Sequence, residues 1–116
     1  MPFGPSLSGG RATLRAVSFR IEYDPAVEDH LNRLTPREEA IVEDAVTRQL
    51  THQPAVATRN RKPLRPNPLA PWELRVGALR VYYEVTEEPE KLVTVRAVGL
   101  KDRNRLIIGG EEIDLS

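Results

Sequence analysis

The stretch WELRVGALRVYYEV, residues 72–85, has the sequence pattern of a β-hairpin and largely decides the fold. Apolar and polar residues alternate on both sides of Gly77-Ala78, as expected for two strands that each bury one face. A two-residue turn with glycine in the first position places Arg75 directly opposite Arg80. Like charges that face each other across strands cost a few tenths to ~1 kcal/mol. The stability of the hairpin therefore does not explain why two arginines face each other here.

Alternation divides the side chains of this hairpin between two faces of the predicted sheet. The apolar face is expected to pack against helices and carries Trp72, Leu74, Val76, Leu79, Val81, Tyr83 and Val85. The polar face carries Glu73, Arg75, Arg80, Tyr82 and Glu84. We interpret the polar face as an arginine-rich surface built on rigid strands.

The segment KLVTVRAVGLK, residues 91–101, is predicted to be the next strand of an antiparallel meander. Its alternation places Val93, Val95 and Ala97 on the apolar face and Thr94 and Arg96 on the polar face. A short C-terminal element is expected from RLIIGGEEIDL, residues 105–115.

Two helices are predicted upstream, after a strand over VSFRIEY, residues 17–23. Asp24-Pro25 has the form of a helix N-cap followed by proline. Thr35 and Glu38 have the spacing of a capping box. The next helix has an apolar stripe of Ile41, Val42, Ala45, Val46, Gln49 and Leu50. We expect the proline-rich residues 54–71 to form a surface connection, because prolines exclude a helix or a central strand.

The composition bounds the class of protein. The chain has 116 residues, of which 40% are hydrophobic and 29% charged, as in one ordinary globular domain. We predict a flexible extension over residues 1–16, which are rich in Gly, Pro and Ser, and a single domain over residues 17–116. No cysteine is present and the two histidines are His30 and His52, so we expect no disulfide, metal or cofactor.

Membrane contact and secretion are not expected either. No apolar run approaches the roughly 18 residues that span a bilayer. The N-terminus lacks the apolar central stretch of a secretory signal. A cytoplasmic location is the resulting expectation.

The formal net charge is zero, but the charges are unevenly distributed. Acidic side chains gather in residues 22–44, and basic ones in residues 59–80 and 101–105. Facing arginine side chains suit phosphate oxygens and stay charged at any relevant pH. The residues alone leave three interpretations open: a phosphate-binding face, a merely solvated face, and a contact surface for an acidic protein.

Several segments together resemble the RelE/ParE toxin superfamily. They are Tyr23-Asp24-Pro25, Lys62-Pro63-Leu64, Trp72-Glu73-Leu74-Arg75-Val76-Gly77, Leu79-Arg80-Val81-Tyr82-Tyr83-Glu84 and Val98-Gly99-Leu100-Lys101-Asp102-Arg103. The resemblance covers roughly residues 18–108. It implies a RelE-like α+β fold in which an N-terminal strand and two helices pack on an antiparallel sheet.

The resemblance also implies a function. RelE-like toxins cut mRNA on the ribosome without a metal and are neutralised by an antitoxin. In that reaction the 2′-hydroxyl of the RNA attacks the adjacent phosphate, and basic residues stabilise the developing charge. Carried over, Arg75 and Arg80 would stabilise the phosphate, Lys62 would contact the RNA backbone or transfer a proton, and Lys101 replaces an arginine common in active members.

Further residues are expected to bind RNA around these four catalytic candidates. They are Arg61, Arg65, Tyr82, Arg96, Arg103 and Arg105. Ile107 occupies the position where the best-known RelE-type nucleases have a C-terminal tyrosine. Two alternatives therefore stay open: a ParE-like inhibitor of DNA gyrase, and a decayed toxin that binds only its antitoxin. All three readings predict a cognate antitoxin as partner, and the nuclease reading adds mRNA and the ribosome.

Overall fold

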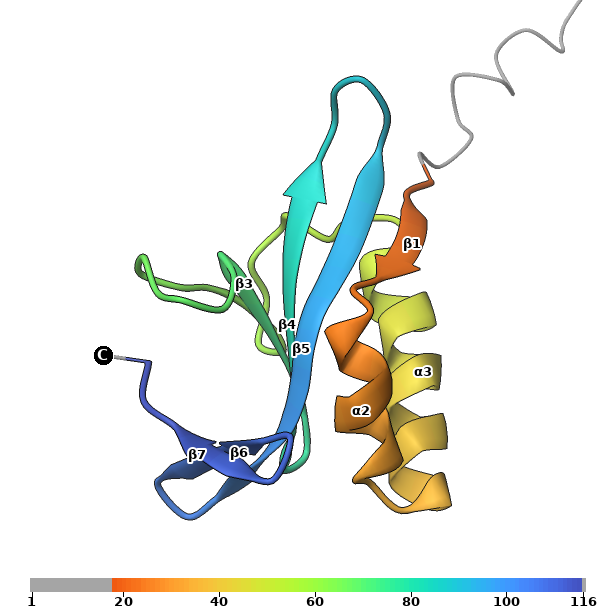
Figure 1. Cartoon of the computed structure of the whole chain (residues 1–116). Coiled ribbons are helices and arrows are strands. Elements are labelled where there is room, and N and C mark those ends of the chain that lie inside the picture. Colours follow the sequence, from red (N-terminus) through yellow and green to blue (C-terminus); the bar gives the residue numbers. More distant parts are fainter. Residues whose placement is uncertain (1–17, 116) are drawn as a thin grey trace, which may run out of the picture.

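The computed structural model describes residues 18–115 and shows two helices on one face of a twisted sheet (Figure 1). The elements are β1 (Arg20–Tyr23), α2 (Ala26–Asn32), α3 (Pro36–Leu50), β2 (Arg61–Pro63), β3 (Trp72–Val76), β4 (Leu79–Thr86), β5 (Leu92–Asp102), β6 (Arg105–Ile108) and β7 (Glu111–Ile113). The predicted α+β class is confirmed. The extension predicted over residues 1–16 lies outside the described residues. No helix between residues 18 and 115 is long and apolar enough to cross a membrane.

The sheet has the order β2-β3-β4-β5-β6-β7, with all neighbours in this path antiparallel. Strand β1 lies parallel to the first part of β5, a direction that the sequence pattern does not specify. The hairpin of β3 and β4 has the predicted register, with Arg75 opposite Arg80. Gly77 has φ +60°, which glycine adopts readily, so the predicted glycine-led turn is confirmed.

The predicted start of α3 is present, whereas α2 begins one residue later than predicted, with Pro25 in place of Asp24 as its N-cap. The Thr35 hydroxyl accepts from the Glu38 amide and the Glu38 carboxylate accepts from the Thr35 amide, which completes the capping box of α3. The Asp24 carboxylate accepts from the Ala26 amide at the start of α2. Most of the predicted stripe of α3 is buried, but Ile41 is 38% exposed and contributes little to the core.

The proline-rich segment differs from the prediction in one respect. Residues 61–63 form the short strand β2 at the edge of the sheet, paired with β3. Pro63 ends this strand, in agreement with the restriction of proline to edge positions in sheets. Residues 64–71, which follow β2, lie on the side of the sheet that faces away from the helices (Figure 1).

The main core lies between the helices and the face of the sheet that we name the helix face. Its strand residues are Leu74, Leu79, Val81, Tyr83, Val93, Val95 and Val98, and its helix residues include Val27, Leu31, Val42, Val46 and Leu50. Trp72 stacks on Tyr83 with ring centroids 6.1 Å apart, as expected for a cross-strand aromatic pair. The predicted apolar face of the hairpin is therefore confirmed.

A β-bulge changes the expected alternation in β5. Tyr82 pairs with Ala97 but Tyr83 pairs with Val95, so Arg96 is the extra residue. Beyond the bulge Val98 joins the main core, and Ala97 turns to the opposite side. The prediction that Ala97 faces the helices is wrong for this reason, since an inserted residue inverts the alternation that follows it.

The opposite side, named here the second face, has a small apolar core of its own. Its buried members are Ala70, Tyr82, Ala97, Leu106 and Ile108, with Leu64, Leu69, Ile113 and Leu115 packed around them. The connection from β2 to β3 and the hairpin of β6 and β7 cover this part of the sheet (Figure 1). The end of the second face near the tip of the β3–β4 hairpin, where Arg75 is exposed and Arg80 is half-buried, is named here its open end.

Candidate functional site

Arg75 and Arg80 face each other at the open end of the second face, as predicted. The Nε of Arg75 donates to the Glu73 carboxylate over 2.7 Å. A terminal nitrogen of Arg80 donates to the carbonyl oxygens of Gly77 and Leu79, over 2.7 and 2.9 Å. Each guanidinium is thus held at one point and retains further N–H donors. The arrangement can present two fixed positive charges to an anion.

Glu73 is the buried acidic residue of this site. One carboxylate oxygen accepts from Arg75, and the other accepts from the Tyr82 hydroxyl over 2.8 Å. Burial by itself raises the pKa of Glu73. The hydrogen bonds from Arg75 and Tyr82 and the nearby guanidinium charges outweigh burial, so the pKa lies below its ordinary value. Glu73 is therefore a stable anion that accepts hydrogen bonds from the Arg75 guanidinium and the Tyr82 hydroxyl.

Tyr82 does not offer the exposed hydroxyl expected of an RNA-binding residue. Its ring is 1% exposed within the small core of the second face. Burial and the hydrogen bond to Glu73 raise the pKa of Tyr82 far above its ordinary value. The sequence placed Tyr82 on the correct face, but alternation could not show that a loop and a hairpin cover it.

The two candidate lysines lie on opposite sides of the arginine pair. Lys62 is a half-buried residue of β2 and pairs in register with Glu73. Lys101 is an exposed residue of β5, and its amide donates to the Ala78 carbonyl at the hairpin tip. Lys62, Arg75, Arg80 and Lys101 thus come from four consecutive strands of the sheet.

Three further predicted RNA-binding residues form an exposed rim. Arg65 lies on the connection between β2 and β3, Arg103 in the turn between β5 and β6, and Arg105 at the start of β6. Arg105 is within 3.8 Å of Glu112 on β7. Arg103 has φ +60°, an uncommon conformation for a residue with a side chain.

Two other predicted RNA-binding residues have structural partners instead. Arg61 is buried, and its guanidinium donates to the carbonyl oxygens of Val56 and Gln49 and to the Gln49 side chain. It fastens the end of α3 to the edge strand. Arg96, the bulge residue, pairs with Asp24 and Glu84.

Ile107 lies on the other side of the sheet from the arginine pair. It pairs with Leu100, whose side chain packs on the main core. Its neighbours Leu106 and Ile108 belong to the second face. Ile108 packs closely over Gly99, the residue opposite Arg80, where a Cβ atom would come within 2.6 Å of the Ile108 side chain. Glycine is required at this point by the close approach.

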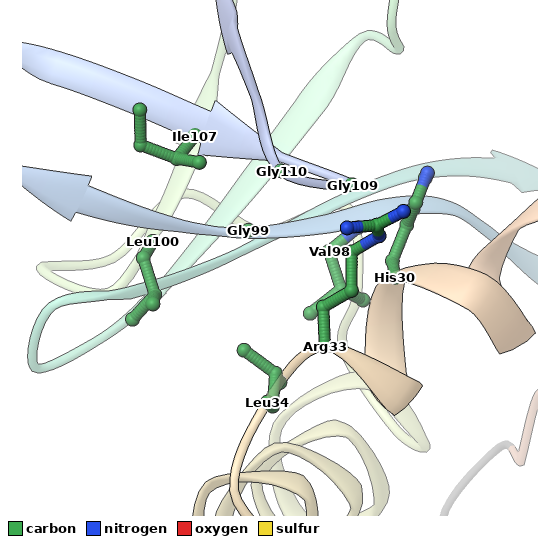
Figure 2. Close-up of a pocket in the computed structure, with 9 residues that line it drawn as sticks. All are labelled: His30, Arg33, Leu34, Val98, Gly99, Leu100, Ile107, Gly109 and Gly110. Atoms are coloured by element: carbon green, nitrogen blue, oxygen red, sulfur yellow. The ribbon is translucent and has the colours of Figure 1, made fainter.

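Ile107 instead lines a hollow of about 220 Å³ between α2 and the β6–β7 turn (Figure 2). His30 and Arg33 project from the end of α2 toward Gly109 and Gly110. The Val98 amide donates to Nδ1 of His30 over 3.3 Å, at the gap between the parts of β5 that pair with β1 and β6. His30 therefore has a structural role in the neutral form, remote from the arginine pair.

The side chains of the described residues indicate which ligands they suit. Between residues 18 and 115, no three His, Asp or Glu side chains come together in an arrangement that could hold a metal ion. The site instead combines fixed cations on an exposed sheet surface, a chemistry suited to binding phosphate groups.

The structure is similar to a chain of the toxin-antitoxin complex RelBE2 from Mycobacterium tuberculosis. The TM-score is 0.64 with 24% sequence identity, and the match covers 75% of this chain and 95% of that chain. No protein-family model matches the sequence, and no curated protein matches it. The protein therefore has the RelE-like fold that its sequence predicts.

Proposed function

We propose that this protein is the toxin of a type II toxin-antitoxin pair and acts as a ribosome-dependent mRNA endoribonuclease in the cytoplasm. The observation that carries the proposal is the facing pair Arg75 and Arg80 at the open end of the second face. On a RelE-like fold, this pair is suited to stabilising a phosphate whose charge increases during cleavage. The structural similarity to a chain of the toxin-antitoxin complex RelBE2 supports an antitoxin as the partner of this protein.

The proposed reaction uses the RNA as its own nucleophile. The 2′-oxygen forms a bond to the adjacent phosphorus and the bond from phosphorus to the 5′-oxygen breaks. The products are a 2′,3′-cyclic phosphate and a 5′-hydroxyl end. Arg75 and Arg80 stabilise the charge on the phosphoryl oxygens. Lys62 and Lys101 are the candidates for accepting the proton of the 2′-hydroxyl and protonating the 5′-oxygen.

A ParE-like inhibitor of DNA gyrase is the second candidate. It is favoured by the lack, within residues 18–115, of an accessible tyrosine or histidine beside the arginine pair. Tyr82 is buried, and His30 lies on the helix side of the sheet. Such an inhibitor would need the basic surface for binding but no group that transfers protons.

A purified translation system distinguishes these proposals. Wild-type protein is expected to stop protein synthesis, and the Arg75→Ala/Arg80→Ala variant to leave it running. Arg37→Ala/Arg48→Ala is the matched control, because it removes two exposed arginines from α3 on the opposite layer. This control should inhibit like wild type. Equal inhibition by the wild type and the Arg75→Ala/Arg80→Ala variant would refute the assigned site. Undisturbed translation together with trapped gyrase-DNA complexes would favour the second candidate.

A further inference from the structure

We propose that Glu73 is a positioning residue for Arg75. The buried carboxylate of Glu73 holds the guanidinium of Arg75 in the orientation that receives an RNA phosphate. The inference rests on the proposed nuclease function and adds to it a residue that does not itself touch the substrate. Its basis is the chain of contacts from Tyr82 through Glu73 to Arg75.

The burial of the two partners is unequal. The Glu73 side chain is 7% exposed and the Arg75 side chain is 46% exposed. A buried carboxylate is costly unless its oxygens are paired, and here each oxygen has a donor of its own. Rotation of the carboxylate would break one of these bonds. Glu73 therefore offers a fixed acceptor to a side chain that would otherwise be mobile at the surface.

Tyr82 links Glu73 to the rigid part of the sheet. Its ring is among the largest fully buried side chains and packs in the core of the second face. The main chain of Arg75 is also held, because its amide donates to the Asn60 carbonyl and its carbonyl accepts from the Asn60 side chain. Arg75 is thus fixed both at its backbone and at Nε.

This fixation determines which part of Arg75 is available. With Nε directed to Glu73, the two terminal nitrogens of the guanidinium remain as donors, and a pair of such donors fits two phosphate oxygens. Arg80 is held differently, through carbonyl oxygens of its own hairpin. Loss of the Glu73 charge is therefore expected to release Arg75 and to leave the contacts of Arg80 in place.

An NMR measurement tests the inference independently of RNA cleavage. Glu73→Gln keeps the shape of the side chain and removes its charge. In NMR spectra of wild-type protein, the Nε–H of Arg75 should be protected from exchange with water, and in Glu73→Gln this protection should be lost. If Glu73→Gln fails to fold, Tyr82→Phe, which removes one anchor of the carboxylate, should reduce the protection. Unchanged protection of Arg75 in the variant that folds would overturn the inference.

A kinetic measurement tests the role in catalysis. Glu73→Gln should lower kcat for ribosome-dependent cleavage by about 10- to 100-fold, the range expected for a misplaced reacting group. KM should change little, because the fixed geometry matters most in the transition state. In an Arg75→Ala background, Glu73→Gln should have no further effect, whereas in an Arg80→Ala background it should. A loss of equal size in both backgrounds would contradict a role through Arg75.

The two levels of proposal can fail separately. If wild-type protein cuts no RNA, the nuclease proposal fails and the NMR comparison still decides whether Glu73 positions Arg75. If wild-type protein cuts RNA and Glu73→Gln cuts it equally well, the nuclease proposal stands and the role of Glu73 is refuted.

Discussion

The two faces of the sheet are both buried at their centres, but by different means. On the helix face, α2 and α3 cover a continuous layer of aliphatic and aromatic side chains. On the second face, a loop and a small hairpin cover a few apolar residues beside a row of charges. The helices cover the helix face, so its strand residues are apolar and buried. The loop and the small hairpin cover only part of the second face, so the arginine pair stays accessible. The helix face therefore contains the main core, and the second face carries the arginine pair for which we propose a role on RNA.

The largest effect on stability is expected on the helix face. Leu74 is fully buried, so Leu74→Ala should lower the free energy of unfolding by about 2–5 kcal/mol through lost transfer energy and a new cavity. Ile41→Ala, on the exposed side of α3, is the control and should change it by about 0.5 kcal/mol or less. Urea denaturation measures both. Similar losses in the two variants would contradict the assignment of the core to this face.

Arg61 tests whether a basic residue beside the site serves the fold. Arg61→Ala removes hydrogen bonds from a buried guanidinium to the end of α3 and should cost about 1.5–3 kcal/mol of unfolding free energy. Arg65→Ala, at an exposed neighbouring position, should cost about 0.5 kcal/mol or less. The reverse order of the two losses in denaturation experiments would show that Arg61 is not the structural residue.

Substitution of Arg103 tests both backbone strain in the turn between β5 and β6 and a contact of this turn with RNA. Its φ of +60° suits glycine better than arginine, so Arg103→Gly should raise the free energy of unfolding by ~1 kcal/mol. The same variant should cleave RNA more slowly if Arg103 contacts the substrate. Asn104→Gly, one position later in the turn, is the control and should bring no gain in stability. A destabilised Arg103→Gly variant would rule out backbone strain at this turn.

The smallest effect expected is a pH dependence from His30. Burial lowers the pKa of His30 from its ordinary value of 6.5, and Asp29 and Asp24 oppose this shift while Arg33 adds to it. Folding therefore favours the neutral imidazole, which accepts from Val98. Its contribution to stability should be complete above about pH 6.5, the ordinary pKa, and should be lost as the pH falls from there through the lower pKa of the folded state.

Denaturation between about pH 8 and pH 5 measures this contribution. His30→Gln keeps an acceptor for the Val98 amide but cannot titrate in this range, so its stability should fall less at low pH. Parallel curves for the wild type and the variant would remove His30 as the source of the pH dependence.

Local patterns predicted most of the helix face and the hairpin from the sequence. The capping box of Thr35 and Glu38 and the glycine-led turn at Gly77 depend on neighbouring residues, and both are present as expected. The strand β2 and the parallel direction of β1 depend on pairing with distant segments. Such pairing leaves little trace in local periodicity.

The candidate site was predicted in part for the same reason. The hairpin register correctly placed Arg75 opposite Arg80. The bulge at Arg96, the burial of Tyr82 and the partners of Arg61 arise from tertiary contacts that alternation cannot reveal. Glu73 was expected on the polar face but was not among the predicted site residues. Its signal was its place two residues before Arg75 and across from Tyr82.

We propose above that the arginine pair of the second face acts on RNA. The most direct test is to map RNA ends that carry a 5′-hydroxyl in a purified translation system. Wild-type protein and the Arg37→Ala/Arg48→Ala control should produce new ends where the ribosome is bound to the mRNA. These ends should be absent with Arg75→Ala/Arg80→Ala. No new ends with wild-type protein at any dose, or the same ends with the Arg75→Ala/Arg80→Ala variant, would contradict the claim.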